Sequence, residues 1–273
     1  MNRSITIASI QMFVHKQKKK NMDEAEKYLK RINQLFPQVK LVIFPEFSFI
    51  DLDLKMKDQA EQIPGDSTRY FSKLAQEYGV WLIPGTMYER FGDHIYNTAL
   101  VFSPNGSLVG KYRKRYPWCP YEKTTPGEDP FVFEIKGIGV VGVMICYDLW
   151  FPEVARDLTN LGAELILIPT MTTTGDRFQE SIIARATAIT QQSYIVSCNG
   201  VGYGGVGGSM IVDPEGHVLQ ESGSGPFMQT AIIDFERVKT LREMGVAGVT
   251  FPWRDYRKNK QTFSVYKGTT KDN

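Results

Sequence analysis

The chain has 273 residues, is 42% hydrophobic, and carries 32 basic and 30 acidic side chains, for a net charge of +2. This balance argues against nucleic acid or an anionic membrane surface as the main partner. The first residues lack the pattern of a signal peptide, and no apolar run reaches the roughly 18 residues that span a bilayer. Three cysteines without repeated spacing predict no disulfide framework, so we expect a reducing cytoplasm.

Apolar and periodic runs alternate along the chain and predict a mixed α/β fold. Strands are predicted at 5–12, 39–44, 80–86, 95–103, 131–135, 139–145, 165–169, 194–198, 209–213, 218–220 and 229–234. Helices are predicted at 21–36, 67–78, 152–161, 177–192 and 236–244, with hairpin turns at 103–107 and 213–216. We therefore expect one domain over residues 1–273, with mixed sheets, helices outside and a C-terminal arm from about residue 251.

The predicted strand 139–145 ends directly before Cys146, and Pro152 follows at a position typical of a first helical turn. A thiol at such a turn is held rigidly near the positive end of a helix, which favours a reactive thiolate. The alternative is an inert buried cysteine that packs as a small apolar side chain.

Two further ionisable residues stand in unusual surroundings. Glu46 follows the apolar run 41–44 between two aromatic residues, where desolvation raises proton affinity and suits a general base. Lys114 belongs to a basic and aromatic segment, 110–118, in which strand alternation would point it to the same face as Tyr112. A carboxylate that caps a turn and an exposed basic edge strand are the respective alternatives.

Histidine-based chemistry and cofactors are not indicated. His15, His94 and His217 are scattered, so we expect no metal site, no Cys-His dyad and no Ser-His-Asp triad. The glycines of segment 202–207 match a dinucleotide-binding motif by letter, but a strand at 209–213 follows where that motif requires a helix. We expect a flexible loop near the site there, and no cofactor.

Together these segments resemble the nitrilase superfamily of carbon–nitrogen hydrolases, whose signature is a Glu, a Lys and a Cys in that chain order. The matching segments are 44–47, 111–114 and 145–148, and supporting matches run from about residue 5 to residue 234. The resemblance implies an α/β fold, a four-layer αββα sandwich with each of these residues at the end of a strand. Segment 117–122 is most similar to the aliphatic amidase and formamidase branch, in which a second Glu follows the Lys by eight residues. Glu122 stands at that spacing from Lys114.

The resemblance also implies a mechanism. Cys146 would attack an amide carbonyl, with Glu46 as general base, and Lys114 and the backbone N–H of Tyr147 would hold the developing oxyanion. Glu122 would orient either Lys114 or the amide nitrogen. No metal or other cofactor is implied.

The resemblance is less informative about the substrate. Trp118, Tyr121 and Trp150 are candidates for the pocket wall, and Thr172 stands in a loop where a Tyr is expected, which would leave a roomier acyl pocket. We expect an amidase that acts on a small carboxamide. The alternatives are a nitrilase, an N-carbamoyl amino acid hydrolase in which Arg177 binds the substrate carboxylate, and an inactive binding protein. By analogy, we expect a homodimer or higher homo-oligomer formed through 152–161 and 177–192.

Overall fold

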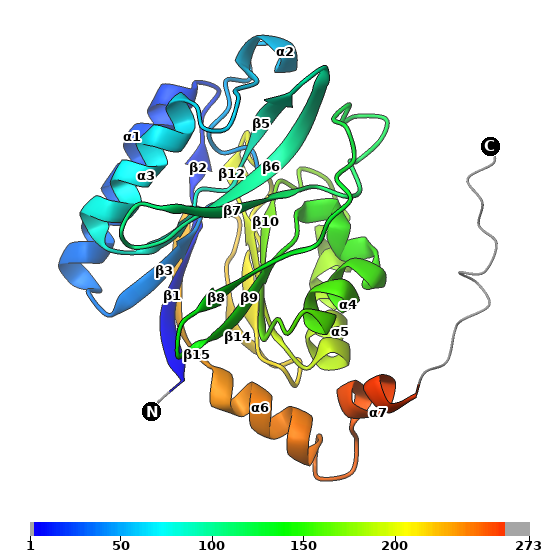
Figure 1. The fold of residues 1–273 in the computed structure, drawn as a ribbon. Coiled ribbons are helices and arrows are strands. Elements are labelled where there is room, and N and C mark those ends of the chain that lie inside the picture. Colours follow the sequence, from blue (N-terminus) through cyan, green and yellow to red (C-terminus); the bar gives the residue numbers. More distant parts are fainter. Residues whose placement is uncertain (1–2, 260–273) are drawn as a thin grey trace.

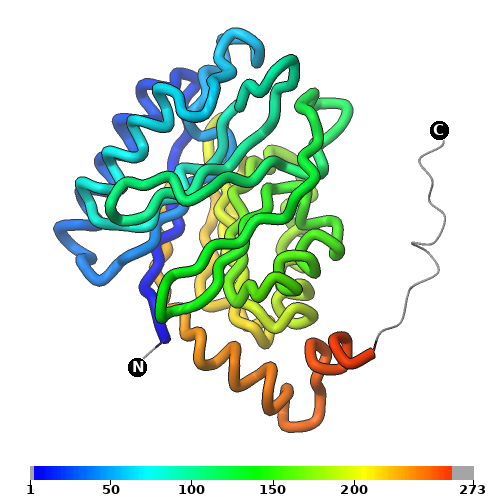
Figure 2. Tube along the Cα trace, viewed as in Figure 1, coloured from blue at the N-terminus to red at the C-terminus, as the bar shows by residue number. Residues whose placement is uncertain are grey.

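The structure, a computed structural model, describes residues 3–259 and contains two large β-sheets (Figures 1 and 2). The first sheet has the order β15 (Phe227–Asp234), β1 (Ser4–Gln11), β3 (Val39–Ile43), β4 (Trp81–Ile83), β6 (His94–Phe102) and β5 (Thr86–Phe91), with β7 (Leu108–Arg113) also paired to β6. The second has the order β14 (Val218–Glu221), β13 (Met210–Val212), β11 (Tyr194–Asn199), β10 (Leu165–Thr170), β9 (Gly139–Val143) and β8 (Phe131–Ile135). A small third sheet pairs β2 (Phe13–Val14) with β12 (Val201–Gly202).

Strand alternation explains how the layers stack. In β3, Leu41 and Ile43 belong to a core shared with Val143 of β9 and Leu167 of β10, so the two sheets face each other there. The intervening Val42 belongs to a second core, which also contains side chains of the helices on the outer side of the first sheet. Each face of the first sheet is therefore buried.

Among the described residues, four helices cover the outer faces of the sheets: α1 (Lys18–Leu35), α3 (Asp66–Tyr78), α4 (Pro152–Asn160) and α5 (Arg177–Gln191). The others are α2 (Met56–Gln59), α6 (Phe235–Met244) and α7 (Pro252–Lys258), and a 3-10 turn, η1, covers Cys146–Trp150. Figure 1 shows α1 and α3 on one side of the molecule and α4 and α5 on the other. The layers run helix, sheet, sheet, helix, which confirms the predicted α/β sandwich. Within residues 3–259, no helix is both long and apolar enough to cross a membrane.

The predicted C-terminal arm contains a helix that packs against the rest of the molecule. The arm predicted from about residue 251 begins as helix α7, whose Trp253 is only 7% exposed. The Trp253 N–H donates to the Gln192 side-chain oxygen at 3.2 Å, so this helix is attached to the end of α5. The rest of the predicted arm, 260–273, lies outside the described residues.

Candidate active site

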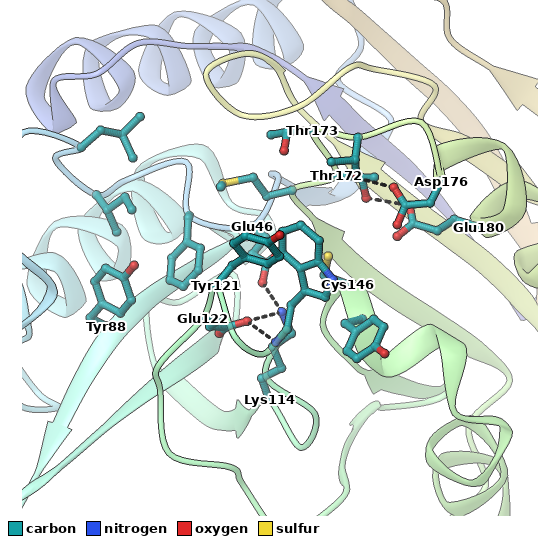
Figure 3. Close-up of a pocket in the computed structure, with 17 residues that line it drawn as sticks. Glu46, Tyr88, Lys114, Tyr121, Glu122, Cys146, Thr172, Thr173, Asp176 and Glu180 are labelled. Carbon is teal, nitrogen blue, oxygen red and sulfur yellow. Dashed lines mark hydrogen bonds and ion pairs between the residues drawn. The ribbon is translucent and has the colours of Figure 1, made fainter.

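Three chain segments bring the predicted Glu, Lys and Cys to one pocket of about 200 Å³ (Figure 3). Glu46 follows β3, Lys114 follows β7, and Cys146 begins η1 after β9. The Glu46 N–H donates to the Thr170 carbonyl at 3.3 Å, which joins the carboxyl ends of β3 and β10 across the two sheets. The pocket therefore lies where strands of both sheets end. Its lining residues are Glu46, Phe47, Ile50, Leu52, Tyr88, Lys114, Trp118, Tyr121, Glu122, Cys146, Tyr147, Met171, Thr172, Thr173, Thr174, Asp176 and Glu180.

Cys146 occupies a sharp turn with a φ of 48°, a left-handed conformation that is costly for a residue with a side chain. The Glu46 carboxylate and the Met171 backbone N–H both act on the pKa of its thiol, so both groups lie close to the sulfur. Burial and then the neighbouring Glu46 raise the pKa of the thiol well above its ordinary value, against the opposing effect of Lys114. The resting group is therefore a neutral thiol that needs a base, whereas sequence reasoning favoured a thiolate.

Lys114 is buried between two carboxylates. Its Nζ lies 2.9 Å from Glu46 Oε1 and 2.7 Å from Glu122 Oε2. Burial alone would lower the pKa of the ammonium, but the neighbouring carboxylates, Glu46 first and then Glu122, outweigh it and raise that pKa well above the ordinary value. Lys114 thus remains cationic in the pocket.

Glu122 accepts four hydrogen bonds, which fixes its position. Oε2 accepts from Lys114 and from the Trp118 N–H at 3.0 Å, and Oε1 accepts from Asn97 at 2.8 Å and Thr124 at 2.9 Å. Burial opposes ionisation of this carboxyl, but Lys114 and these donors hold its pKa below the usual value. Of the two predicted tasks for Glu122, the geometry matches the orientation of Lys114.

Glu46 has the opposite electrostatic character. Burial is the largest effect on its pKa and raises it, Glu122 adds to the rise, and Lys114 and the Cys146 thiol oppose it. The net result is a carboxyl with raised proton affinity beside a neutral thiol, as a general base requires.

Asn97 is a site residue that sequence reasoning missed. This fully buried side chain of β6 donates to Glu46 Oε1 at 2.7 Å as well as to Glu122. The polar pair Asn97 and Thr98, directly before the apolar run 99–102 of the same strand, was the available signal. The Met171 N–H that acts on the thiol left no such signal, because every residue except proline carries a backbone N–H.

Asp148 connects the turn of Cys146 to the segment of Lys114. Its Oδ2 accepts from the Tyr112 hydroxyl at 2.7 Å and the Ile145 N–H at 2.9 Å, and its Oδ1 accepts from the Tyr116 N–H at 2.9 Å. Burial raises the pKa of this carboxyl to about 6 despite these donors. Tyr112 and Tyr116 stand on either side of Lys114 in sequence, so one carboxylate positions both groups.

The predicted substrate-binding residues Tyr147, Trp118 and Thr172 all line the pocket, as does Tyr121. Trp150 does not line it, and its ring is tilted against that of Tyr147 at a centroid distance of 6.4 Å. The Thr172 hydroxyl is not free, because it donates to Glu180 Oε2 at 2.6 Å.

Arg177 does not reach the pocket as the carbamoyl-hydrolase alternative requires. Its guanidinium is paired with Glu180 Oε2 at 2.8 Å and donates to Ser197 and to the Gly208 carbonyl. These partners hold the guanidinium next to β11 and the segment before β13, and Arg177 does not line the pocket. The geometry of Arg177 therefore gives no support to the alternative in which it binds a substrate carboxylate.

The loop that contains the glycines of 202–207 lies against the pocket. The Val206 N–H donates to the Thr172 carbonyl at 2.9 Å, and the loop leads into β13. The predicted placement near the site therefore agrees with the structure, and a strand follows this loop rather than the helix that a dinucleotide site needs.

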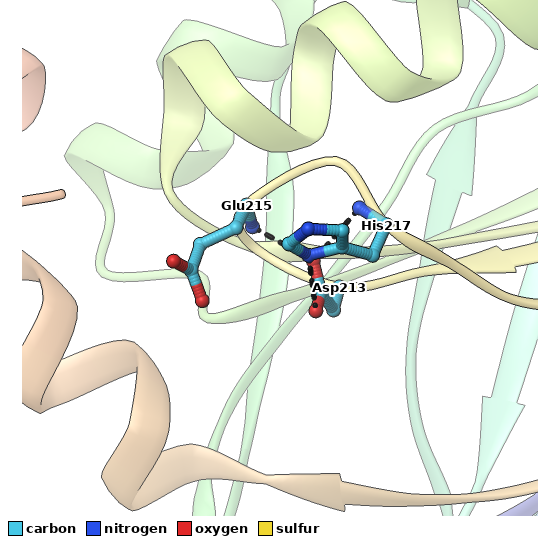
Figure 4. Close-up of side chains that lie close together, drawn as sticks. All are labelled: Asp213, Glu215 and His217. Carbon is cyan, nitrogen blue, oxygen red and sulfur yellow. Dashed lines mark hydrogen bonds and ion pairs between the residues drawn. The ribbon is translucent and has the colours of Figure 1, made fainter. Parts of the chain in front are cut away.

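Figure 4 shows the one group of three acidic and histidine side chains close enough to share a cation within residues 3–259: Asp213, Glu215 and His217. Asp213 Oδ1 accepts the N–H groups of Glu215 at 2.9 Å and of His217 at 3.0 Å, so this carboxylate stabilises the β13–β14 hairpin turn. Arg237 pairs with Asp213 at 2.8 Å and also with Glu215. The Arg237 guanidinium already balances the carboxylates of Asp213 and Glu215, and these residues stabilise the hairpin turn.

Comparison with known proteins places this geometry in a family. The family model of carbon–nitrogen hydrolases matches residues 6–243. Omega-amidase NIT2 of Xenopus tropicalis is 32% identical over 255 residues, which cover 87% of this chain and 91% of the relative. The crystal structure of Saccharomyces cerevisiae Nit3, a member of branch 10 of the nitrilase superfamily, matches with a TM-score of 0.80 and 28% identity over 88% of this chain and 94% of that one.

A third similarity concerns the fold alone. A mutant of the amidase from Nesterenkonia sp. AN1, 23% identical, matches with a TM-score of 0.77 over 87% of this chain and 92% of that one. The family model spans most of the described residues, including all four of Glu46, Lys114, Glu122 and Cys146. The chain belongs to the carbon–nitrogen hydrolase family, and it is an amidase-type hydrolase of the nitrilase superfamily.

Proposed function

We propose that this protein hydrolyses a small carboxamide to the carboxylic acid and ammonia through a thioester on Cys146. The observation that carries the proposal is that Cys146, Glu46 and the Lys114 ammonium line one pocket, with Lys114 Nζ 2.9 Å from Glu46 Oε1. A nucleophile, a base and a cation meet at one point where an amide carbonyl can bind.

In the first half of the reaction, Glu46 takes the thiol proton while the sulfur forms a bond to the carbonyl carbon. The carbonyl oxygen becomes an oxyanion, held by Lys114 and the backbone N–H of Tyr147; one such preorganised donor contributes about 10²–10³-fold to the rate. The C–N bond then breaks, and Glu46 returns its proton to the departing nitrogen, which leaves as ammonia.

In the second half, water attacks the thioester. Glu46 accepts a proton from the water as the oxygen bonds to the acyl carbon, and the same two donors hold the second oxyanion. The C–S bond breaks, the sulfur recovers a proton from Glu46, and the carboxylic acid is released. Lys114, fixed by Glu122, keeps its charge throughout.

The pocket size and the relatives support a small substrate. A pocket of about 200 Å³ is below the range of roughly 300–1,000 Å³ that is typical of sites for drug-sized ligands. Relatives that match over most of this chain are named omega-amidases, and the Nesterenkonia enzyme is described with an acetamide moiety added at its active-site cysteine. Both descriptions are consistent with amide chemistry at Cys146.

The test combines turnover with mass measurement. Purified protein is assayed for ammonia release from acetamide, propionamide, butyramide, the matching nitriles and N-carbamoyl amino acids. We expect turnover of the amides, loss of that turnover in Cys146→Ala with an unchanged circular dichroism spectrum, and an acyl mass on the intact wild-type chain. Cys119→Ala, which removes an exposed thiol, serves as the matched control and keeps its activity.

Retained activity in Cys146→Ala would exclude the mechanism. Ammonia release from nitriles alone would favour the nitrilase alternative, which uses the same three residues. Release from carbamoyl compounds alone would favour that class despite the pairing of Arg177 with Glu180. Binding of these compounds without turnover would favour the binding protein.

We also propose that the protein works in a reducing compartment, the cytoplasm. Cys119, Cys146 and Cys198 are all free thiols. A free nucleophilic thiol is preserved under reducing conditions, whereas oxidants convert it to sulfenic acid or a disulfide.

A further inference from the structure

The charges that line the pocket are strongly unequal. Among the described residues, Lys114 is the only cation in the lining, whereas Glu46, Glu122, Asp176 and Glu180 all carry carboxyl groups. Lys114 is already shared between Glu46 and Glu122. The catalytic end of the pocket therefore offers no free positive group to the acyl chain of a substrate.

Thr172, Asp176 and Glu180 also line the pocket, and Figure 3 shows them gathered together. The charge of Glu180 is balanced by Arg177, whose NH1 lies 2.8 Å from Glu180 Oε2. That guanidinium points away from the pocket, to Ser197 and the Gly208 carbonyl. A substrate carboxylate would meet Glu180 and not the arginine behind it.

Asp176 is the carboxylate that no cation balances. It is half-buried at the start of α5, and the Thr174 hydroxyl donates to its Oδ1. Within residues 3–259 it makes no ion pair, and its Oδ2 has no hydrogen-bond donor. Because a half-buried charge is screened less than one in bulk water, Asp176 attracts a cation and repels an anion.

Part of the remaining wall is apolar, beside side chains that carry hydroxyl groups. Phe47, Ile50, Leu52, Trp118 and Met171 line it and provide no charged group. Such a surface suits an aliphatic chain that runs from the amide at Cys146 to a polar end group.

We propose that the pocket selects carboxamides whose acyl chain ends in a protonated amine, and that Asp176 is the residue that determines this specificity. This inference rests on the proposed amidase function and adds its substrate class. The amine binds at Asp176, the methylene groups lie along the apolar wall, and the amide carbon lies at the Cys146 sulfur.

The test uses three amides of similar length at pH 7.5 and low salt: 5-aminopentanamide, its uncharged isostere hexanamide, and glutaramate. We expect kcat/KM to be about tenfold higher for 5-aminopentanamide than for hexanamide, equivalent to roughly 1.4 kcal/mol, and lowest for glutaramate. Added KCl should reduce the preference, because salt screens the interaction.

Asp176→Asn removes the charge and keeps an oxygen for Thr174. In this variant the ratio of kcat/KM for 5-aminopentanamide to that for hexanamide should fall about tenfold, equivalent to roughly 1.4 kcal/mol. Asp176→Glu should retain the preference, and Asp93→Asn, an exposed turn aspartate, is the matched control. Equal rates for 5-aminopentanamide and hexanamide, or a preference for glutaramate, would overturn the inference.

Binding measurements separate this inference from the proposed function. Calorimetry with Cys146→Ala reports whether 5-aminopentanamide binds more tightly than hexanamide when no chemistry occurs. A preference that disappears in the double variant with Asp176→Asn supports the inference. Absence of turnover in the wild-type protein contradicts the amidase function, whereas absence of a binding preference contradicts only the role of Asp176.

Discussion

At the scale of single residues, Glu46 and Glu122 show how neighbours set different tasks for the same side chain. Glu122 accepts four hydrogen bonds, and these hold its pKa below the usual value. For Glu46, burial and the neighbouring Glu122 carboxylate raise the pKa against the opposing effects of Lys114 and the Cys146 thiol. One carboxylate is thus a permanent anion that positions Lys114, and the other can exchange a proton with Cys146.

This difference predicts an acidic limb in the pH profile. Catalysis needs ionised Glu46, so kcat/KM should fall as pH decreases through the raised pKa of that carboxyl, with a midpoint above the ordinary 4.5. Initial rates from pH 4 to pH 9, with circular dichroism at each pH to exclude unfolding, measure the midpoint. A midpoint at or below 4.5 in folded protein would contradict this protonation state.

Glu46→Gln should lower kcat at every pH by about 10²–10⁴-fold, the usual contribution of a general base. The Gln oxygen can still accept from Asn97 and Lys114, so we expect the variant to fold. Glu77→Gln, at an exposed position of α3, is the control and should leave the profile unchanged. Wild-type rates in Glu46→Gln would assign the base to another group.

Sequence reasoning identified those side chains whose local surroundings are unusual. Glu46, Lys114 and Cys146 each stand beside apolar or aromatic runs, and the resemblance added Glu122. Asp176 was not identified, because its place in the pocket depends on how α5 packs against the end of the second sheet. Charge balance across a pocket is a tertiary property, and no local pattern contains it.

At the scale of elements, Asp148 ties η1 to β7. The carboxylate accepts donors from Ile145, Tyr112 and Tyr116. Its folded pKa of about 6 exceeds the ordinary 3.8, so the folded state binds the proton more tightly. The contribution of this group to stability therefore falls as pH rises from about 3.8 through about 6, and is constant above that range.

Tyr112→Phe removes one donor to this carboxylate. We expect a loss of about 1–3 kcal/mol in the free energy of unfolding, larger at pH 8, where Asp148 is ionised, than at pH 5. Urea unfolding at the two pH values measures it, and Tyr28→Phe, at a half-buried position of α1, is the control. An equal loss at both pH values would show that the hydroxyl does not stabilise the ionised carboxylate.

Most helices and strands with a clear apolar pattern were predicted within a few residues. Elements that lack this pattern, because contacts with other segments bury their charged or polar residues, were not predicted. β5 was missed because Glu89 interrupts its pattern; that carboxylate is 1% exposed and pairs with Lys111 and Arg113 of β7. α7 was also missed, since its only deeply buried side chain is Trp253. Contacts with segments that are distant in the sequence stabilise such charged or polar stretches as helices and strands.

At the scale of the whole molecule, we propose that two copies associate through α4 and α5, the helices that Figure 1 shows on one outer side. On α5, Phe178 is 69% exposed, Ile182 52% and Ile189 42%. Their spacing places them on one face of the helix, and Leu161 next to α4 is 51% exposed. Apolar side chains in such a row are typical of a surface that another copy covers.

The change Ile182→Glu tests this association, because it places a charge in the proposed interface without touching the core. We expect light scattering after gel filtration to give at least twice the 31.0 kDa of one chain for the wild type, and a single-chain mass for the variant. Leu35→Glu, at a 60%-exposed position at the end of α1, is the matched control and should not change the mass. A single-chain mass for the wild type would contradict the association. An unchanged mass for Ile182→Glu would show that the interface lies elsewhere.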